Sequence, residues 1–450
     1  MSIQRNRPGA YVELHAKALA RVTPASGRVL LPYQSEWGKP NLAVDMADDT
    51  ERLAESGKQV DVLELAGENG ATVVGYRVTN GQELPALYSL QDSYAVEARY
   101  PGTRGNDFEF MIRTSLIDAT KKEILVRDTK GIYDNETFLV ADKAAAVSAT
   151  ERSNMIRFKD LGAVAWADVA FTPLTGGTSG TATITPADWS RIFNRIDGLL
   201  FDVFYLPSTD KAVQAAAKQW LLDRRTKARR LAQLVVAGEA AKDGDIEAHN
   251  ERSRSMNARW VINSSLAGEH SNGKTYDSVA WAAWVAGLIA GTPANKSLTG
   301  VKVPMTAAKV DWSHSEVLKG LAEGTLMATR DGYDYIIESA VNTLTTLGDG
   351  EREDFGKIRV SMTIDQLLND IYSTGKKYRG KLDNDKDGRG LFIAAVLEYL
   401  KIRAQQKAIA DTYSFGESAT QTSDFDYAYF DLLAKPLDAI EIFNINWEVA

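Results

Sequence analysis

The chain of 450 residues contains no cysteine and only four histidines. Without cysteine it cannot form a disulfide, a thiolate zinc site, an iron–sulfur cluster or a cysteine nucleophile. The histidines are widely separated and lack metal-ligand spacing, so few residues are candidates for histidine catalysis. They are His15, His249, His270 and His314. We therefore expect no metal site, no cofactor and no enzymatic activity.

The sequence also lacks long apolar runs and a positive charge balance. No stretch of about 18 apolar residues is present, so we expect no membrane insertion. The basic residues of Met1–Pro8 are not followed by an apolar signal core, so the product is expected to begin in a cytoplasm. The net charge of −8 argues against a nucleic-acid partner, because such proteins need a positive field.

Composition is otherwise that of a globular protein, with 44% hydrophobic and 25% charged residues. The length predicts two to four domains. Near the N-terminus, Val12 and Leu14 lie on the apolar side of a period-2 pattern, which predicts a strand. A second strand is expected at 28–31, and we assign residues 1–35 to an N-terminal arm and first strand.

Residues 40–175 are expected to form a β-rich inserted domain. Its predicted strands are 60–65, 72–78, 122–127 and 137–140, separated by a dense loop at 100–107. The segment Pro173–Gly180 contains a Gly-Gly pair and predicts a flexible domain boundary.

Residues 176–345 alternate strands and helices at the spacing of βαβ units, which predicts an α/β core with a parallel sheet. Apolar strand candidates lie at 199–206, 231–236 and 259–263, and helices at 186–196, 210–225 and 276–289. A hairpin with an Asp331-Gly332 turn follows.

Residues 346–450 are expected to form an α+β domain with a terminal strand arm. Its helices are predicted at 358–372 and 391–409. In the final strand, Phe443, Ile445, Trp447 and Val449 alternate with polar residues.

One segment matches a phosphate-binding motif. Gly268–Thr275 reads G-x-x-x-x-G-K-[ST], follows a predicted strand and precedes a predicted helix. Lys274 would then contact β/γ oxygens and Thr275 a magnesium ion, with Asp202 as the metal aspartate. The alternative is a surface turn bent at Asn272-Gly273.

Two further charged segments favour structural roles. Asp383–Gly388 resembles the start of a calcium loop, but Ala394 stands where a bidentate Glu is required, so a helix-capping linker is expected. The basic run Arg224–Arg230 lacks interleaved aromatics and is more typical of a solvated helix end, although it could also meet an acidic face of another subunit.

Each end of the chain carries a one-faced strand whose edge nothing in the sequence protects. Adding such a strand to another subunit's sheet would bury apolar side chains at about 1.5–3 kcal/mol each. Backbone hydrogen bonds would add roughly 0.5–1.5 kcal/mol apiece. The alternative is that both ends pair within their own subunit.

Several motifs resemble the tail sheath proteins of contractile bacteriophages, and in particular the type found in Gram-positive phages and prophages. They keep the family's order and span almost the whole chain: Arg7–Glu13, the Y-P-G-x-x-G-N loop in Ala98–Asp107, Leu174–Gly177, the small-residue helix Ala282–Gly291 and the terminal Ala439–Asn446.

The resemblance implies a virion structural protein that forms helically stacked hexameric rings around a tail tube. The sheath would assemble in the host cytoplasm and contract after a baseplate trigger to drive the tube through the host envelope. Terminal arms would add strands to the C-terminal domains of neighbours, and the implied partners are the tail tube, baseplate and tail terminator proteins. A sheath from a phage-derived bacteriocin or secretion apparatus is an alternative source, and a P-loop hydrolase is the alternative class.

We therefore predict inter-subunit strand exchange through two sets of residues. They are Val12 and Leu14 at the N-terminus, and Ile442, Phe443, Ile445, Trp447 and Val449 at the C-terminus. Contact with the tube is predicted for the charged side chains of the helix near 391–409, namely Lys401, Arg403 and Lys407.

Overall fold

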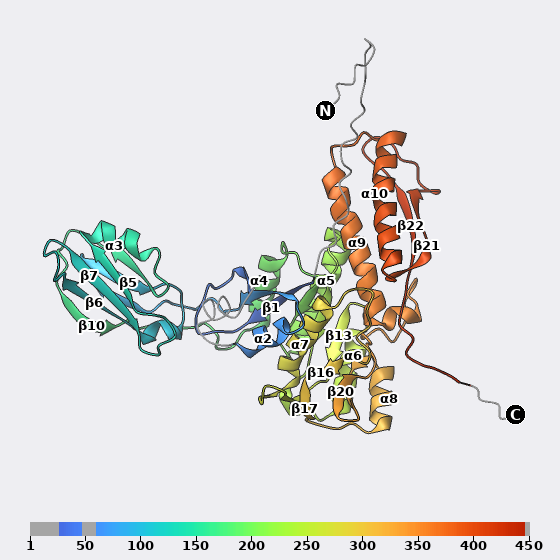
Figure 1. The fold of residues 1–450 in the computed structure, drawn as a ribbon, viewed down its shortest axis with the longest axis horizontal. Helices are drawn as coiled ribbons and strands as arrows, with labels where there is room; N and C mark the ends of the chain where they lie inside the picture. The colour runs from blue at the N-terminus through green and yellow to red at the C-terminus, as the bar shows by residue number, and fades with distance from the viewer. Residues whose placement is uncertain (1–26, 47–59, 446–450) are drawn as a thin grey trace, which may run out of the picture. The chain divides into compact units, whose positions relative to one another are not determined.

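The computed structural model describes residues 27–46 and 60–445 (Figure 1). The chain divides into two compact units. Of the described residues, the core unit contains 27–46, 60–366 and 438–445, and the helix–hairpin unit contains 367–437. Four predicted strand-exchange residues lie outside the described residues: Val12, Leu14, Trp447 and Val449.

The core unit is built on a seven-stranded sheet of order β18-β13-β12-β11-β1-β3-β2. Every neighbouring pair is parallel except β2–β3, which confirms the predicted parallel α/β core. The strands are β1 (Arg28–Tyr33), β2 (Ala43–Asp45), β3 (Thr72–Arg77), β11 (Val203–Tyr205), β12 (Gln233–Val236), β13 (Val261–Ser264) and β18 (Thr325–Leu326).

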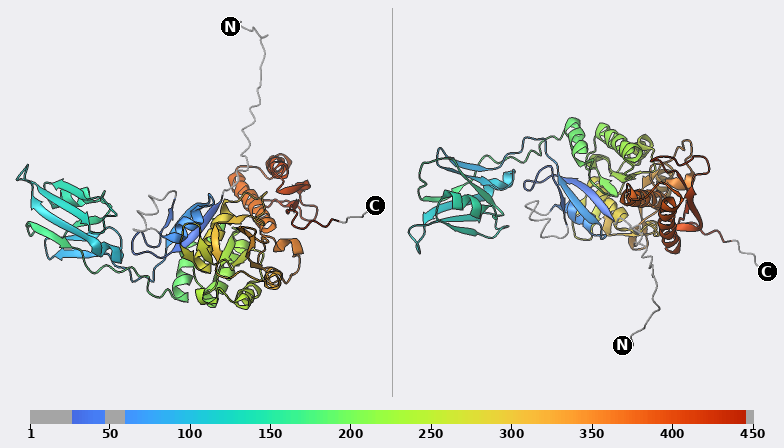
Figure 2. Two further views of the ribbon diagram at one scale, coloured as in Figure 1. Left: turned by 60° about the horizontal axis from the view of Figure 1, so that its bottom comes forward. Right: turned by 90° about the horizontal axis from the view of Figure 1, so that it is seen from above.

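Helices cover both faces of this sheet (Figures 1 and 2). Val29 and Leu31 face a cluster that includes α7 (Ser278–Gly291), whereas Leu30 faces the opposite cluster with α4 (Pro186–Ile196) and α5 (Lys211–Asp223). Successive side chains of this buried strand therefore pack into two different cores, as expected for a parallel sheet that is covered on both faces. Two more helices belong to the unit: α6 (Ile246–Met256) and α8 (His314–Ala322).

The strand predicted at 60–65 is wrong, because this segment forms helix α2 (Asp61–Gly67). Packing against α7 explains the difference. A Cβ at Gly287 would lie 2.0 Å from the Ala66 carbonyl oxygen, and one at Gly291 would lie 2.1 Å from that of Asn69. The two glycines let α2 and its following turn approach α7 closely, and this tertiary contact overrides the alternating pattern.

The inserted domain is a β-sandwich, with an aromatic-rich core between two sheets. One sheet contains β10 (Val169–Pro173), β6 (Phe108–Thr114), β7 (Lys122–Asp128) and β8 (Glu136–Val140); the other contains β4 (Leu87–Leu90), β5 (Tyr94–Ala98) and β9 (Ile156–Asp160). Helix α3 (Lys143–Thr150) covers one end. The boundary predicted at residue 40 is therefore corrected, because β2, α2 and β3 belong to the core and the sandwich strands begin at Leu87.

Two small sheets complete the core unit. The first contains β15 (Thr275–Tyr276), β14 (Gly268–His270) and β17 (Met305–Ala308). The second contains β16 (Lys302–Val303), β20 (Asp334–Ile337) and β19 (Ala328–Asp331). The β19–β20 pair confirms the predicted hairpin at Asp331-Gly332.

The helix–hairpin unit packs two helices against one antiparallel hairpin. Helix α9 (Ile358–Tyr378) enters it from the core unit and is followed by α10 (Lys386–Gln405), β21 (Ile409–Glu417) and β22 (Phe430–Pro436). Asp385 caps α10 by accepting from the Gly388 amide at 2.7 Å, so the calcium-like segment is a capping linker, as expected. None of the described helices is long and apolar enough to cross a membrane.

Candidate inter-subunit linkage site

The segment that follows β22 presents apolar side chains to solvent. Residues 437–445 form no strand, so the part of the predicted terminal strand that the structure describes is not formed within the subunit. The exposed fractions of Ile440, Ile442, Phe443 and Ile445 are 74%, 78%, 74% and 86%. Such a cluster of exposed large side chains is typical of a surface that a partner covers.

One residue of this segment, Glu441, is fixed to the core unit. Its carboxylate accepts from Thr299 Oγ1 at 2.7 Å, Ser339 Oγ at 2.9 Å and Lys357 Nζ at 2.6 Å. Burial acts to raise the pKa of Glu441, but these hydrogen bonds and the Lys357 charge outweigh it and hold the pKa below its ordinary value. Glu441 therefore anchors the start of the exposed segment.

Glu441 was not predicted as a functional residue. Its only sequence signal is a single acid between Ile440 and Ile442, and its partners come from three distant parts of the chain.

The β21–β22 hairpin offers edges at which a strand could be added. Among the described strands each of the two pairs only with the other. The inner face carries Phe415 and Phe430, whose rings lie 5.7 Å and 5.2 Å from that of Phe392 on α10. A two-stranded sheet is marginal alone, and its long edges can template further pairing.

A buried polar network joins α9 to α10 beneath the hairpin. Arg403 donates to the Tyr399 hydroxyl and to Asp370, both at 3.0 Å, and Tyr399 also contacts Asp370. Burial, with the nearby Asp370 carboxylate, raises the pKa of Tyr399. The guanidinium of Arg403 is buried and paired within the subunit, which does not favour the predicted contact with a tube; that contact stays a prediction.

The other two predicted tube-contact residues are differently placed. Lys401 is exposed on α10, and Lys407 lies just beyond the helix with its Nζ 3.4 Å from Asp411. Their contact with a tube stays a prediction.

The glycine-rich loops singled out in the sequence hold the sandwich strands in place. The Asn106 side chain exchanges two hydrogen bonds with the Gly177 backbone, at 3.1 and 2.8 Å. A Cβ at Gly177 would lie 2.4 Å from the Gly102 oxygen, so the two loops require glycine to meet. These motifs are structural.

A residue that the sequence did not single out, Arg77, joins these segments. It is fully buried and donates to the carbonyl oxygens of Ser35, Gly38, Pro101 and Ser179. Burial lowers the pKa of Arg77 to about 10.

The phosphate-binding interpretation of Gly268–Thr275 is wrong. The motif is split between strands β14 and β15, which pair as a tight antiparallel hairpin. Lys274 Nζ lies 2.6 Å from Asp61, and the side chain of Asp277 caps α7 through the Ala280 amide. Because a carboxylate occupies this helix N-terminus, it is not available to a phosphate.

Contacts within the subunit bear on two further predictions. Asp202, suggested as the metal aspartate, accepts from the Arg28 amide at 2.9 Å. The basic run is not simply a solvated helix end, because Arg224 and Arg225 are buried; Arg225 forms an ion pair with Asp365, and Arg224 donates to backbone carbonyls. Among the described residues, no group of three acidic, His or Cys side chains could hold a metal ion.

Comparison with known families matches three consecutive parts of the chain. Residues 58–181 match the phage tail sheath protein beta-sandwich domain, residues 182–343 the phage tail sheath protein central domain, and residues 351–450 the phage tail sheath C-terminal domain. The chain belongs to the phage tail sheath family. The exposed segment and the hairpin both lie in the C-terminal domain of that family.

Relatives are similar over different shares of the chain. The Phage-like element PBSX protein XkdK of Bacillus subtilis (strain 168) is 26% identical over 490 residues, which cover 99% of this chain and 98% of that protein. The Tail sheath protein of Clostridium phage phiCD119 is 26% identical over 224 residues, or 50% of this chain and 58% of that protein.

Solved structures share the fold. The sheath tail protein from Desulfitobacterium hafniense superposes with a TM-score of 0.74 at 21% identity, covering 95% of this chain and all of that one. The sheath of an extracellular contractile injection system in its contracted state gives a TM-score of 0.55 at 9% identity, covering 99% and 98% of the two chains. The mixed α/β architecture with an inserted sandwich is thus that of sheath proteins.

Proposed function

We propose that this protein polymerises as helically stacked hexameric rings around a tail tube and contracts to drive the tube through a host envelope. As a family of structural proteins, sheaths form part of the virion tail. The observation that carries the proposal is the terminal segment, in which one anchored residue, Glu441, is followed by exposed apolar side chains.

The link between copies is a donated strand. Ile442–Val449 of one copy adds to the edge of the β21–β22 hairpin of another, and Val12 and Leu14 of the N-terminal arm supply a second strand. Each buried apolar side chain contributes about 1.5–3 kcal/mol, and each backbone hydrogen bond about 0.5–1.5 kcal/mol. A few such joints hold a lattice together firmly.

Strand donation suits a polymer that must rearrange without coming apart. Residues 437–440 have no regular structure and join β22 of each copy to its own Glu441 anchor, whereas the hydrogen bonds of the proposed joint would lie within one sheet. Ring packing can then change while each strand stays in its acceptor.

The remaining partners follow from this role. Exposed Lys401 and Lys407 are proposed to contact an acidic surface of the tail tube, and baseplate and tail terminator proteins close the two ends. Assembly takes place in the host cytoplasm. A sheath of a phage-derived bacteriocin or injection apparatus would use the same contacts.

Truncation tests the linkage. We expect the variant lacking residues 442–450, which keeps Glu441, to unfold at the same temperature as the full chain but to form no tubes in negative-stain electron microscopy. Ile117→Asp is the matched control, because Ile117 is 92% exposed in the sandwich and should leave the tubes intact. Normal tubes from the truncated chain would remove the linkage.

A further inference from the structure

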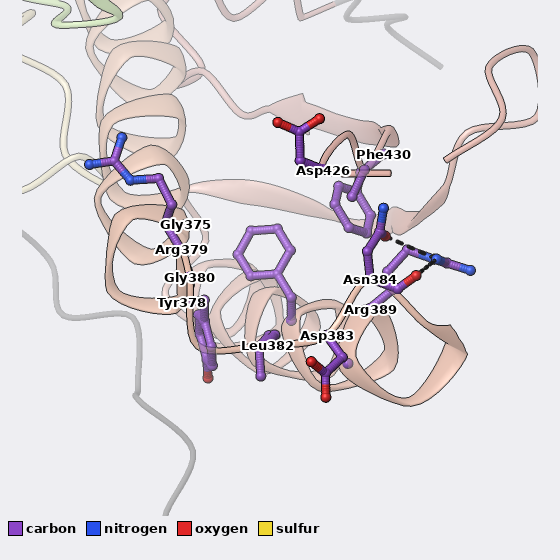
Figure 3. A pocket seen from close by; sticks show the side chains of 13 residues that line it. Gly375, Tyr378, Arg379, Gly380, Leu382, Asp383, Asn384, Arg389, Asp426 and Phe430 are labelled. Carbon is purple, nitrogen blue, oxygen red and sulfur yellow. Dashed lines mark hydrogen bonds between the residues drawn. The ribbon is translucent and has the colours of Figure 1, made fainter. Parts of the chain in front are cut away.

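A pocket of about 260 Å³ opens in the helix–hairpin unit between the ends of α9, α10 and β22. Tyr378 and Phe430 lie on opposite sides of it (Figure 3). Between them, the ring of Phe392 lies 5.8 Å from that of Tyr378 and 5.2 Å from that of Phe430. The lining is therefore aromatic, with charged side chains at the rim.

The size and shape of the pocket favour a single large side chain. Small-molecule sites usually occupy about 300–1,000 Å³, and this pocket is smaller. Two hydrogen bonds stabilise the rim of the pocket, because Arg389 donates to the side-chain and backbone oxygens of Asn384, both at 3.0 Å (Figure 3). Gly375 lines the pocket, and a Cβ there would lie in ordinary contact with Phe392, at 3.8 Å, so only a larger side chain at this position would fill the space.

The position of the pocket points to the donated strand. Its lining includes Asp426, Ala428 and Phe430, which lead into β22, and no residue of β21. A strand added to the β22 edge in the common antiparallel sense would start near Pro436 and run toward Phe430. Only the last part of such a strand would reach the pocket.

Apolar and polar residues alternate along the donated strand, and this alternation limits which of its residues can lie opposite each residue of β22. The inward-facing residues of β22 are Phe430, Leu432 and Ala434, which pack in the cluster beneath the hairpin. The apolar residues of the donor must face the same side. If Phe443 lies opposite Pro436, Trp447 lies opposite Leu432. If the strand is shifted by two residues, Trp447 lies opposite Phe430.

We propose that Trp447 from a second copy fills this pocket and locks the donated strand in register; the inference rests on the strand donation proposed above. In both registers Trp447 is directly or diagonally opposite Phe430, within reach of an aromatic side chain. The indole also supplies the large apolar surface that an aromatic pocket selects. The pocket thus acts as a specificity site for the joint.

Photo-crosslinking of assembled tubes tests the proposal. A benzophenone amino acid replaces Trp447 in one preparation and Ile445 in another, and each is co-assembled with isotope-labelled subunits so that adducts between copies can be identified. We expect the 447 probe to give adducts between copies on Tyr378, Leu382 or Phe392. The 445 probe should give adducts between copies on β22.

The two probes separate the two claims. Adducts on β22 from position 445, with none in the pocket from position 447, would overturn the pocket and keep strand donation. No adducts between copies from either position would overturn both. Adducts within one copy from position 447 would show that the chain fills its own pocket and would likewise overturn the inference.

A second measurement avoids the probe. Gly375→Leu should fill the pocket, whereas Gly390→Leu is the matched control, because a Cβ at this other helical glycine meets open space. Gly375→Leu and Trp447→Ala should each weaken the tube joint about tenfold, and the double variant no more than either alone. If the double variant weakened the joint by the sum of the two single effects, positions 375 and 447 would not share a contact.

Discussion

The parallel sheet of the core unit and the β21–β22 hairpin differ in the length of their edge strands. The seven-stranded sheet ends in β18 and β2, which are only two and three residues long. The hairpin strands are nine and seven residues long, with no further described strand beside them. Short edge strands prevent association, whereas long ones invite it. The core sheet thus has short edges, whereas the hairpin has the long edges that the proposed strand donation requires.

Aspartate substitutions in the core sheet and in the segment proposed to join the hairpin should differ most strongly in their effects. Leu234→Asp in β12 would place a charge in a fully buried core, so we expect a loss above about 4 kcal/mol and no folded core unit. Ile445→Asp should leave the unfolding temperature of the monomer unchanged and abolish tube formation. Thermal unfolding and negative-stain microscopy measure the two effects. Tubes of normal length from Ile445→Asp would break the comparison.

The β21–β22 hairpin packs over a buried polar network that joins α9 to α10. Asp370→Asn would leave Arg403 without its buried carboxylate and should cost about 3–5 kcal/mol of unfolding free energy. Asp411→Asn breaks only the exposed pair with Lys407 and should change it by less than about 1 kcal/mol. Urea denaturation measures both. Equal effects would mean that the Asp370–Arg403 pair does not support the hairpin.

Two glycine-to-alanine substitutions, one in each unit, should change stability in opposite directions. Gly287→Ala would push a Cβ to 2.0 Å from the Ala66 oxygen and should destabilise the core unit by about 1–3 kcal/mol. Gly390→Ala in α10 meets open space and should stabilise its helix by about 0.5–1 kcal/mol. Opposite shifts in unfolding temperature are therefore expected. A stabilising Gly287→Ala would refute the close packing of α2 on α7.

The smallest expected effect is the pH dependence of the stabilisation that Glu441 provides. Because folding lowers the pKa of Glu441, its stabilisation is complete above the ordinary pKa of 4.5 and is lost as pH falls through the lowered value. Hydrogen exchange at residues 439–445 should therefore accelerate relative to flanking loops as the pH falls below 4.5. Glu441→Gln should remove this dependence. An unchanged acid response in that variant would place the anchor elsewhere.

Much of the fold was predictable because its signals are local. The apolar β11, β12 and β13 strands, the α4 and α5 helices and the Asp331-Gly332 turn each follow from a short pattern. The α2 helix was not predictable, since its conformation depends on glycines of α7, more than 200 residues away.

The candidate site shows the same limit. The exposed apolar side chains of Ile442–Ile445 were identified from alternation, and their exposure agrees with a donated strand. Glu441 and the burial of Arg403 were missed, because both depend on partners brought together only by the fold. A charge pattern alone cannot separate Arg403, which is enclosed, from Lys401, which is exposed two residues earlier.

A helical reconstruction of the assembled tube by electron cryo-microscopy tests the central claim most directly. Strand donation predicts that residues 442–449 of one copy form an additional strand on the β21–β22 hairpin of another. It also predicts that Glu441 stays bound to Lys357 of its own chain. A hairpin whose edges are empty, or paired with residues 442–449 of the same chain, would contradict it.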